Sequence, residues 1–174
     1  IWLSKLNEVA KNHKKFRDSN GAIRLDLPKT DIKVKDQKVL VVPHLVSESR
    51  EMVSELMVLA GRAIAQYSIE KNISMPYLSQ APGKFSDEII EKIRNLSLSK
   101  AFETAKGFSR SKLSVEPSIH AGLGLEAYIR VTSPMRRYLD LIVQQQLINY
   151  LSGSELLKEN DIKDRIKVNN ASMS

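Results

Sequence analysis

The fold is decided by one stretch of this sequence, Leu123-Gly124-Leu125-Glu126-Ala127-Tyr128-Ile129-Arg130-Val131-Thr132-Ser133-Pro134-Met135-Arg136-Arg137-Tyr138-Leu139-Asp140. Its first part, residues 125–131, is apolar and rich in residues that favour strands. An amphipathic pattern begins at Pro134 and continues through residue 151. Ser133 is a good N-cap, and proline suits the first position of a helix. The stretch therefore predicts a strand at 125–131 that leads into a helix over 134–151.

Two arginines, Arg136 and Arg137, fall in the first turn of this predicted helix. A helix N-terminus carries partial positive charge and unpaired N–H groups, so acidic residues are expected there. A bound anion would compensate the positive charge of two guanidinium groups at a helix N-terminus. Phosphate can accept hydrogen bonds from both the backbone N–H groups and the guanidinium groups. We interpret the stretch as a phosphate-binding helix start. The alternative is a solvated basic turn in which Asp140 pairs with Arg136 at i,i+4 spacing.

The same stretch, together with the residues before it, resembles a known family. Residues 120–128, followed by 132–138 and Asp140, are similar to the most diagnostic segment of the ribonuclease II family. The catalytic unit of that family, the RNB domain, degrades RNA from its 3′ end by metal-assisted hydrolysis. Residues 21–28 and 49–60 are similar to two further family segments, and all three occur in the family's order. The chain departs from the family pattern at Gly61, where asparagine is common, at Arg130, where histidine is frequent, and at Gln144-Gln145, where a His-Arg pair is frequent.

The composition suits a polyanionic partner without locating its binding site. Lysine and arginine outnumber aspartate and glutamate by 27 to 20, which gives a formal net charge of +7. Nucleic acid is the first candidate partner and an anionic membrane the second, while a lysine-rich surface explains the charge about equally well. The absence of cysteine excludes disulfides and thiolate metal sites, and no apolar run is long enough to span a bilayer. We expect a cytoplasmic protein, with an organelle as the alternative.

The remaining pattern predicts an α+β fold, in which short antiparallel strands pack with several helices and long helices dominate the C-terminal half. We expect one partial domain over residues 1–174. Helices are predicted at 2–17, from Ser47 or Ser49 to Glu70, at 86–96, at 101–108 and from Asp161 onward. Short strands are predicted at 23–27, 31–34 and 38–42, the last two as a hairpin, with an extended piece near 77–78.

The resemblance implies roles for particular residues. Arg136 is the expected catalytic residue, because its guanidinium would neutralise charge on the scissile phosphate in the pentavalent transition state. Thr132, Ser133 and Arg137 are expected to contact RNA. For both hydroxyls, helix capping is the alternative role, compatible with the first.

Glu55 and Tyr128 are also expected to contact RNA, and each of them has an alternative role. Glu55 matches a family glutamate that faces the nucleotide channel, but a solvated helix face shared with Glu51 explains it about as well. Tyr128 could stack on a base, although a buried core tyrosine is the more common case. His120 matches a family position where we expect a structural hydrogen bond.

The resemblance implies part of a 3′-to-5′ hydrolytic exoribonuclease that degrades single-stranded RNA to nucleoside monophosphates with Mg²⁺. No aspartate cluster able to hold Mg²⁺ is visible in the sequence. The family's metal aspartates belong to a motif that precedes these segments, so we expect this chain to lack them, along with an S1-type RNA-binding domain. We expect neither a small-molecule cofactor nor a membrane partner.

Two alternative functions remain. The chain could belong to an RNB relative that lost its metal site and only binds RNA. It could also be a helical DNA-binding module, but the predicted helix over 134–151 is apolar along one face and basic only in its first turn, as suits phosphate binding rather than base reading.

Overall fold

The structure is a computed structural model that describes residues 2–23, 30–35, 38–43, 47–83, 107 and 109–171. Within these ranges the fold is α+β, as predicted. The elements are, in order, α1 (Trp2–Ser19), β1 (Thr30–Lys35), β2 (Lys38–Pro43), α2 (Glu48–Glu70), β3 (Tyr77–Ser79), β4 (Lys112–Ser114), the 3-10 helix η1 (Ala121–Leu123), α5 (Tyr138–Ser152) and α6 (Glu159–Ala171). The predicted strand at 23–27 and the predicted helices at 86–96 and 101–108 lie almost entirely outside the described residues.

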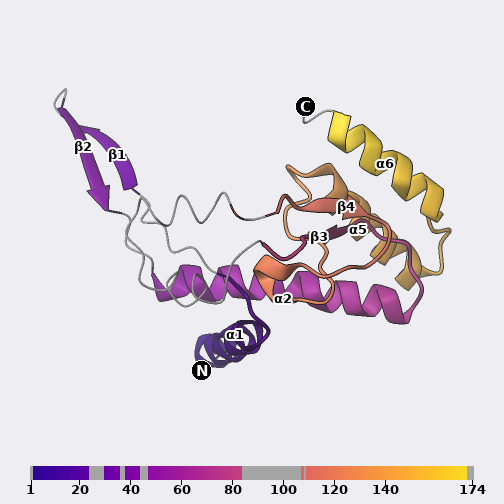
Figure 1. The fold of residues 1–174 in the computed structure, drawn as a ribbon, viewed down its shortest axis with the longest axis horizontal. Helices are drawn as coiled ribbons and strands as arrows, with labels where there is room; N and C mark the ends of the chain where they lie inside the picture. Colours follow the sequence, from indigo (N-terminus) through magenta and orange to yellow (C-terminus); the bar gives the residue numbers. More distant parts are fainter. Residues whose placement is uncertain are drawn as a thin grey trace.

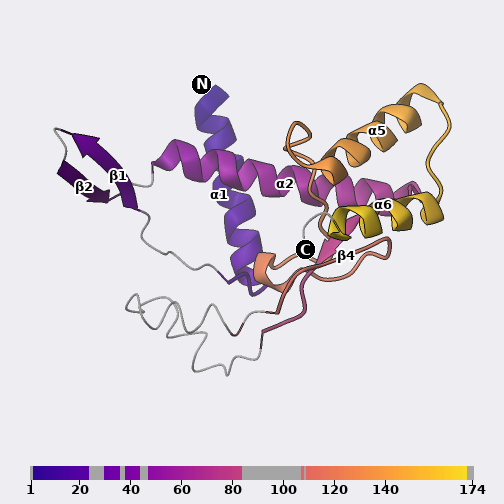
Figure 2. The ribbon, with the colours of Figure 1, turned by 90° about the horizontal axis from the view of Figure 1, so that it is seen from above.

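The long helix α2 runs through the molecule, and α1 crosses it (Figures 1 and 2). The start and end of α2 agree with the prediction. Ser47 is its N-cap, and the Ser47 side chain accepts a hydrogen bond from the backbone N–H of Arg50 at 3.4 Å. Glu48 and Glu51 lie in its first turn, where the helix dipole favours acidic side chains.

The main core lies between α2, residues 73–77, the extended segment 127–131 and α5. Ala127, Ile129 and Val131 are buried in this core with Ala65 of α2 and Val143 of α5. Alternate burial is the pattern expected of extended backbone. The segment is extended as predicted, but the prediction of a strand at 125–131 is wrong, because its backbone hydrogen bonds go to unlike partners instead of to one neighbouring strand.

Two of these backbone hydrogen bonds fix the segment between β3 and α2. The N–H of Leu78 in β3 donates to the carbonyl oxygen of Tyr128 at 2.9 Å, and the N–H of Ile129 donates to that of Gly61 in α2 at 3.4 Å. The second bond requires a very close approach. A Cβ atom at Gly61 would lie 2.3 Å from the Ile129 carbonyl oxygen, so only glycine fits there.

A second cluster joins α5 to α6. Leu139 and Ile142 of α5 are buried against Ile162 and Ile166 of α6. The helix α6 begins two residues before the predicted Asp161, whose carboxylate accepts the N–H of Lys158 at 2.9 Å. A carboxylate in the first turn satisfies an N–H group that the helix itself leaves unpaired.

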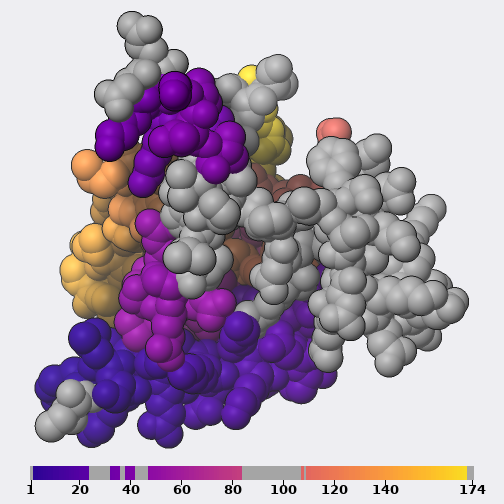
Figure 3. Space-filling view, turned by 90° about the vertical axis from the view of Figure 1, so that its left-hand side faces the viewer, coloured from indigo at the N-terminus to yellow at the C-terminus, as the bar shows by residue number. Residues whose placement is uncertain are grey.

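The strands β1 and β2 form the predicted antiparallel hairpin, with Thr30 opposite Pro43 and Lys35 opposite Lys38. It stands apart from the helices in Figures 1 and 2, and in Figure 3 it lies at the top, with α1 along the lower edge. Large apolar side chains are exposed on the hairpin, among them Ile32, Val34 and Val41. Along the described residues, no helix is both long and apolar enough to cross a membrane.

Candidate nucleic-acid interface

Residues 133–137 form a turn that leads into α5. The backbone N–H groups of Arg136 and Arg137 both donate to the carbonyl oxygen of Ser133, at 3.2 and 3.0 Å. Arg137, not Ser133, is the N-cap of α5, with extended backbone angles of φ −131° and ψ 111°. The predicted helix start at Pro134 is therefore wrong, since α5 begins four residues later at Tyr138.

Asp140 explains why the helix begins late. Its side chain is fully buried, and its Oδ2 accepts the backbone N–H of Ser133 at 2.9 Å. The same oxygen accepts a hydrogen bond from Nε of Arg137 at 2.9 Å and forms an ion pair with Nη2 of Arg137 at 2.7 Å. One carboxylate in the first turn of α5 thus holds both ends of the preceding turn, and charge-assisted bonds of this kind are among the strongest in proteins.

These contacts separate the two arginines. The expected pairing of Asp140 with Arg136 is wrong, because Arg136 lies in the turn and helical i,i+4 spacing does not apply to it. The guanidinium of Arg136 is exposed and makes one long contact, 3.4 Å from Nη2 to the Ser133 hydroxyl. Nowhere in the described ranges does it pair with a carboxylate. Arg136 can therefore bind an anion, while the Arg137 side chain is held by Asp140. Beside them, the Thr132 side chain is exposed and that of Ser133 half-buried.

Tyr128 lies beside this turn and is half-buried. Its ring packs so closely on α2 that a Cβ atom at Gly61 would lie 2.4 Å from Cε2. It also makes an edge-to-face contact with the His120 ring, at 5.7 Å between centroids. Burial raises the pKa of the Tyr128 hydroxyl, and the positive charges of Arg137 and Arg130 oppose that rise. Tyr128 is therefore a neutral aromatic residue at the boundary between core and surface.

His120 is buried beneath Tyr128. Its backbone N–H donates to the carbonyl oxygen of Leu125 at 2.8 Å, whereas its ring Nδ1 is buried without a hydrogen-bond partner. Burial lowers the pKa of the imidazole, and the charges of Arg17 and Arg130 lower it further. Nδ1 of His120 therefore does not make the structural hydrogen bond that we expected; the backbone makes one instead, and the neutral ring packs against Tyr128.

Glu55 lies in the interface between α1 and α2. Its Oε1 is 2.7 Å from Nδ1 of His13 and 3.4 Å from Nε of Arg17, and all three side chains are buried. The alternative of a solvated helix face shared with Glu51 is wrong for Glu55, because α1 packs across this part of α2. Glu51 is exposed and lies 3.7 Å from Lys14 Nζ. Burial lowers the pKa of His13, and the hydrogen bond to Glu55 opposes that shift.

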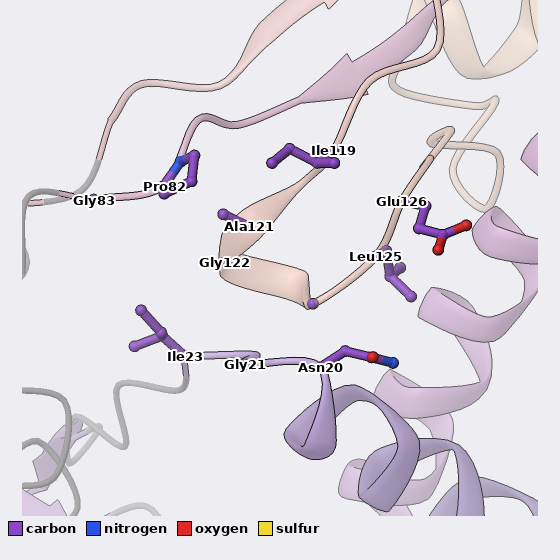
Figure 4. A pocket seen from close by; sticks show the side chains of 11 residues that line it. Asn20, Gly21, Ile23, Pro82, Gly83, Ile119, Ala121, Gly122, Leu125 and Glu126 are labelled. Carbon is purple, nitrogen blue, oxygen red and sulfur yellow. The ribbon is translucent and has the colours of Figure 1, made fainter. Parts of the chain in front are cut away.

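A cavity of about 390 Å³ lies between the end of α1 and η1, and Figure 4 shows side chains that line it. Its lining is mostly apolar and includes Ile23, Pro82, Ile119 and Leu125. The residues expected to contact RNA do not line this cavity, so it is separate from the turn at 133–137.

No three aspartate, glutamate or histidine side chains in the described part of the chain lie together as a metal site would require. In the buried carboxylate of Asp140, Oδ2 is engaged by Arg137 and the Ser133 N–H, and Oδ1 has no hydrogen-bond partner in the described residues, but a single carboxylate oxygen does not make a metal site. These residues therefore do not fit a Mg²⁺ ion.

Comparison with known proteins identifies relatives over nearly the whole chain. Residues 2–153 match the family model of the RNB domain. An uncharacterized ribonuclease of Synechocystis is 36% identical over 154 residues, which cover 87% of this chain and 23% of that protein. The chain spans about a fifth to a quarter of the length of the curated relatives that it matches.

Solved structures share the fold. RNase R of Mycoplasma genitalium, in complex with ribose-methylated single-stranded RNA, superposes with a TM-score of 0.74 at 21% identity, over 95% of this chain and 31% of that chain. Yeast Ssd1, described as a pseudonuclease, superposes with a TM-score of 0.64 at 14% identity, over 98% of this chain and 25% of that chain. The fold alone therefore does not distinguish an active nuclease from an inactive one.

Proposed function

Because this chain belongs to the RNB family, we propose that it is the later portion of the catalytic domain of a 3′-to-5′ exoribonuclease. The full-length protein would hydrolyse single-stranded RNA and release nucleoside monophosphates. The match to the RNB family and the 36% identity to a protein named a ribonuclease support this proposal.

Arg136 is the proposed catalytic residue. The observation that carries this assignment is the contrast between two neighbouring arginines, one exposed at the turn and the other bound to a buried carboxylate. The Arg136 guanidinium, which has no carboxylate partner in the described ranges, is available to an anion whose charge grows in the transition state. Asp140 would contribute indirectly, since it fixes the turn that carries Arg136.

The surrounding residues would hold the RNA near Arg136. We assign phosphate contacts to the hydroxyls of Thr132 and Ser133, and base contact to the ring of Tyr128. Arg137 would contribute its positive charge to the same phosphates while remaining bound to Asp140. Glu55 would act as a positioning residue for RNA binding, because its carboxylate is buried against Arg17.

The proposed hydrolysis needs Mg²⁺, which activates water and stabilises the transferring phosphate. Its ligands would come from a part of the protein outside this chain, together with the rest of the RNB domain and an S1-type RNA-binding domain. We place the protein in the cytoplasm or in an organelle. A relative in Arabidopsis is named as chloroplastic and mitochondrial.

The test is a cleavage assay with the full-length protein. Single-stranded RNA labelled at its 5′ end should shorten progressively in Mg²⁺, with nucleoside monophosphates as products and no cleavage in EDTA. Tight RNA binding without any cleavage would instead establish the second candidate, an RNA-binding protein that has lost its nuclease activity, which the shared fold with a pseudonuclease makes worth testing. Release of internal fragments would contradict both.

A further inference from the structure

The extended segment 127–132 presents a second face, opposite the core. Ala127, Ile129 and Val131 point into the main core. Side chains of extended backbone alternate, so Tyr128, Arg130 and Thr132 lie together on the other face. Tyr128 and Arg130 are half-buried and Thr132 is exposed. This face therefore carries an aromatic ring, a cation and a hydroxyl in a row, next to the turn that holds Arg136.

The charges around this face do not balance. Arg137, Arg130 and Arg17 all act electrostatically on Tyr128. Arg17 pairs with Glu55 at 3.4 Å, and Arg137 pairs with Asp140 at 2.7 Å. Within the described ranges Arg130 forms neither an ion pair nor a hydrogen bond. Three guanidinium groups thus share two carboxylates, and the uncompensated charge is that of Arg130.

An uncompensated charge on a half-buried side chain is unfavourable, since water solvates it poorly and no carboxylate replaces that water. The nearby His120 adds no negative charge, because a buried imidazole with a lowered pKa is neutral at pH 7. Several other arginines in the described ranges have partners. Arg62, for example, lies over the Phe16 ring at 3.9 Å. Arg130 is therefore suited to an anion supplied from outside the chain.

We propose that Arg130 binds a backbone phosphate of the RNA, on the face that it shares with Tyr128 and Thr132. This inference rests on the proposed function, because RNA supplies the phosphate. It adds a binding residue outside the turn at 133–137. A guanidinium can donate two parallel hydrogen bonds to phosphate oxygens, and the neighbouring Tyr128 ring is placed to contact the nucleotide attached to that phosphate. Arg130 would supply affinity and RNA register, whereas Arg136 would act on the reacting phosphate.

The test measures RNA affinity of the full-length protein as a function of salt concentration, with a single-stranded RNA and without Mg²⁺. Each phosphate contact to a single strand adds about 0.7 to the slope of log Kobs against log [salt]. Arg130→Gln should therefore reduce the magnitude of this negative slope by about 0.7, and it should weaken RNA binding about tenfold at moderate salt. The matched control is Arg110→Gln, which removes the same group from an exposed position before β4, and it should leave the slope unchanged.

Two further measurements separate binding from a structural role. Arg130→Lys should keep the slope, because the charge remains, while affinity falls several-fold because an ammonium cannot make the two-pronged contact. Without RNA, Arg130→Gln should leave Tm unchanged or raise it, since it removes an uncompensated charge. A lower Tm, or an unfolded variant, would overturn the proposal by showing that Arg130 pairs within the protein.

An unchanged slope for Arg130→Gln, or the same decrease for Arg110→Gln, would also overturn it. Failure of the proposed function gives a different result, because the unsubstituted protein would then not degrade the RNA, whether or not it binds it. A protein that binds and degrades RNA normally, but whose salt slope does not depend on Arg130, would refute only this inference.

Discussion

The contact between Arg137 and Asp140 predicts a sharp difference in stability between two neighbouring substitutions. Arg137→Ala removes a charge-assisted hydrogen bond of 2.9 Å and an ion-pair contact of 2.7 Å from a carboxylate that is fully buried. Breaking a fully buried ion pair costs about 3–5 kcal/mol. The Arg137 side chain is 27% exposed, and Asp140 retains the N–H of Ser133, so we expect a smaller loss of about 2 kcal/mol.

Arg136→Ala is the matched control, one position away. Its guanidinium makes a single 3.4 Å contact and is exposed, so the free energy of unfolding should change by less than about 0.5 kcal/mol. The assay is urea denaturation of both variants of the full-length protein. A double-mutant cycle with Asp140→Asn should give a coupling energy of about 1–3 kcal/mol for Arg137 and near zero for Arg136. Equal destabilisation by the two alanine substitutions would refute the assignment of Asp140 to Arg137.

Three other predictions concern packing, pH and association. Gly61→Ala should lower Tm and reduce the free energy of unfolding by about 1–3 kcal/mol through overpacking, because the new Cβ would lie 2.3 Å from the Ile129 carbonyl oxygen. An unchanged Tm would contradict this close approach. Burial lowers the pKa of His13 in the folded state, so its contribution to stability is present above about pH 6.5 and is lost as the pH falls through the lowered folded pKa. The fall in Tm between pH 7.5 and 5.5 should therefore be smaller in His13→Gln, and an identical fall would contradict the shift. The isolated 174-residue chain should self-associate through its exposed hairpin. Analytical ultracentrifugation should show less self-association when Ile32→Lys and Val41→Lys are combined. A monomeric unsubstituted chain would contradict this prediction.

Short sequence patterns correctly predicted those helices and strands whose ends depend on residues close by in the sequence. The start of α2 follows from Ser47 as a cap with acidic residues after it, and the hairpin follows from two apolar runs joined around residues 36–37. The apolar residues of 125–131, which favour strands, correctly predicted extended backbone for this segment. In each of these elements, the residues that stabilise the structure are close together in the sequence.

Tertiary contacts decided the rest. Ser133 and Pro134 favour a helix start. However, the buried carboxylate of Asp140 binds Arg137, and α5 begins only at Tyr138. The burial of Glu55 depends on α1 crossing α2, a contact across 42 residues of sequence that no local periodicity reveals. The uncompensated charge of Arg130 was equally hidden, because it appears only once the carboxylate partners of the other arginines are known.

The central claim, that Arg136 acts on charge that develops during cleavage, is tested most directly by comparing rate and affinity in Arg136→Ala. Single-turnover cleavage and RNA binding are measured on one RNA at one salt concentration with the full-length protein. The rate should fall by about 10²–10³, as is common when one preorganised electrostatic contact is lost. Affinity should change little, because many other phosphate contacts contribute to binding. Equal losses of rate and affinity would contradict the claim and make Arg136 an ordinary phosphate-binding residue.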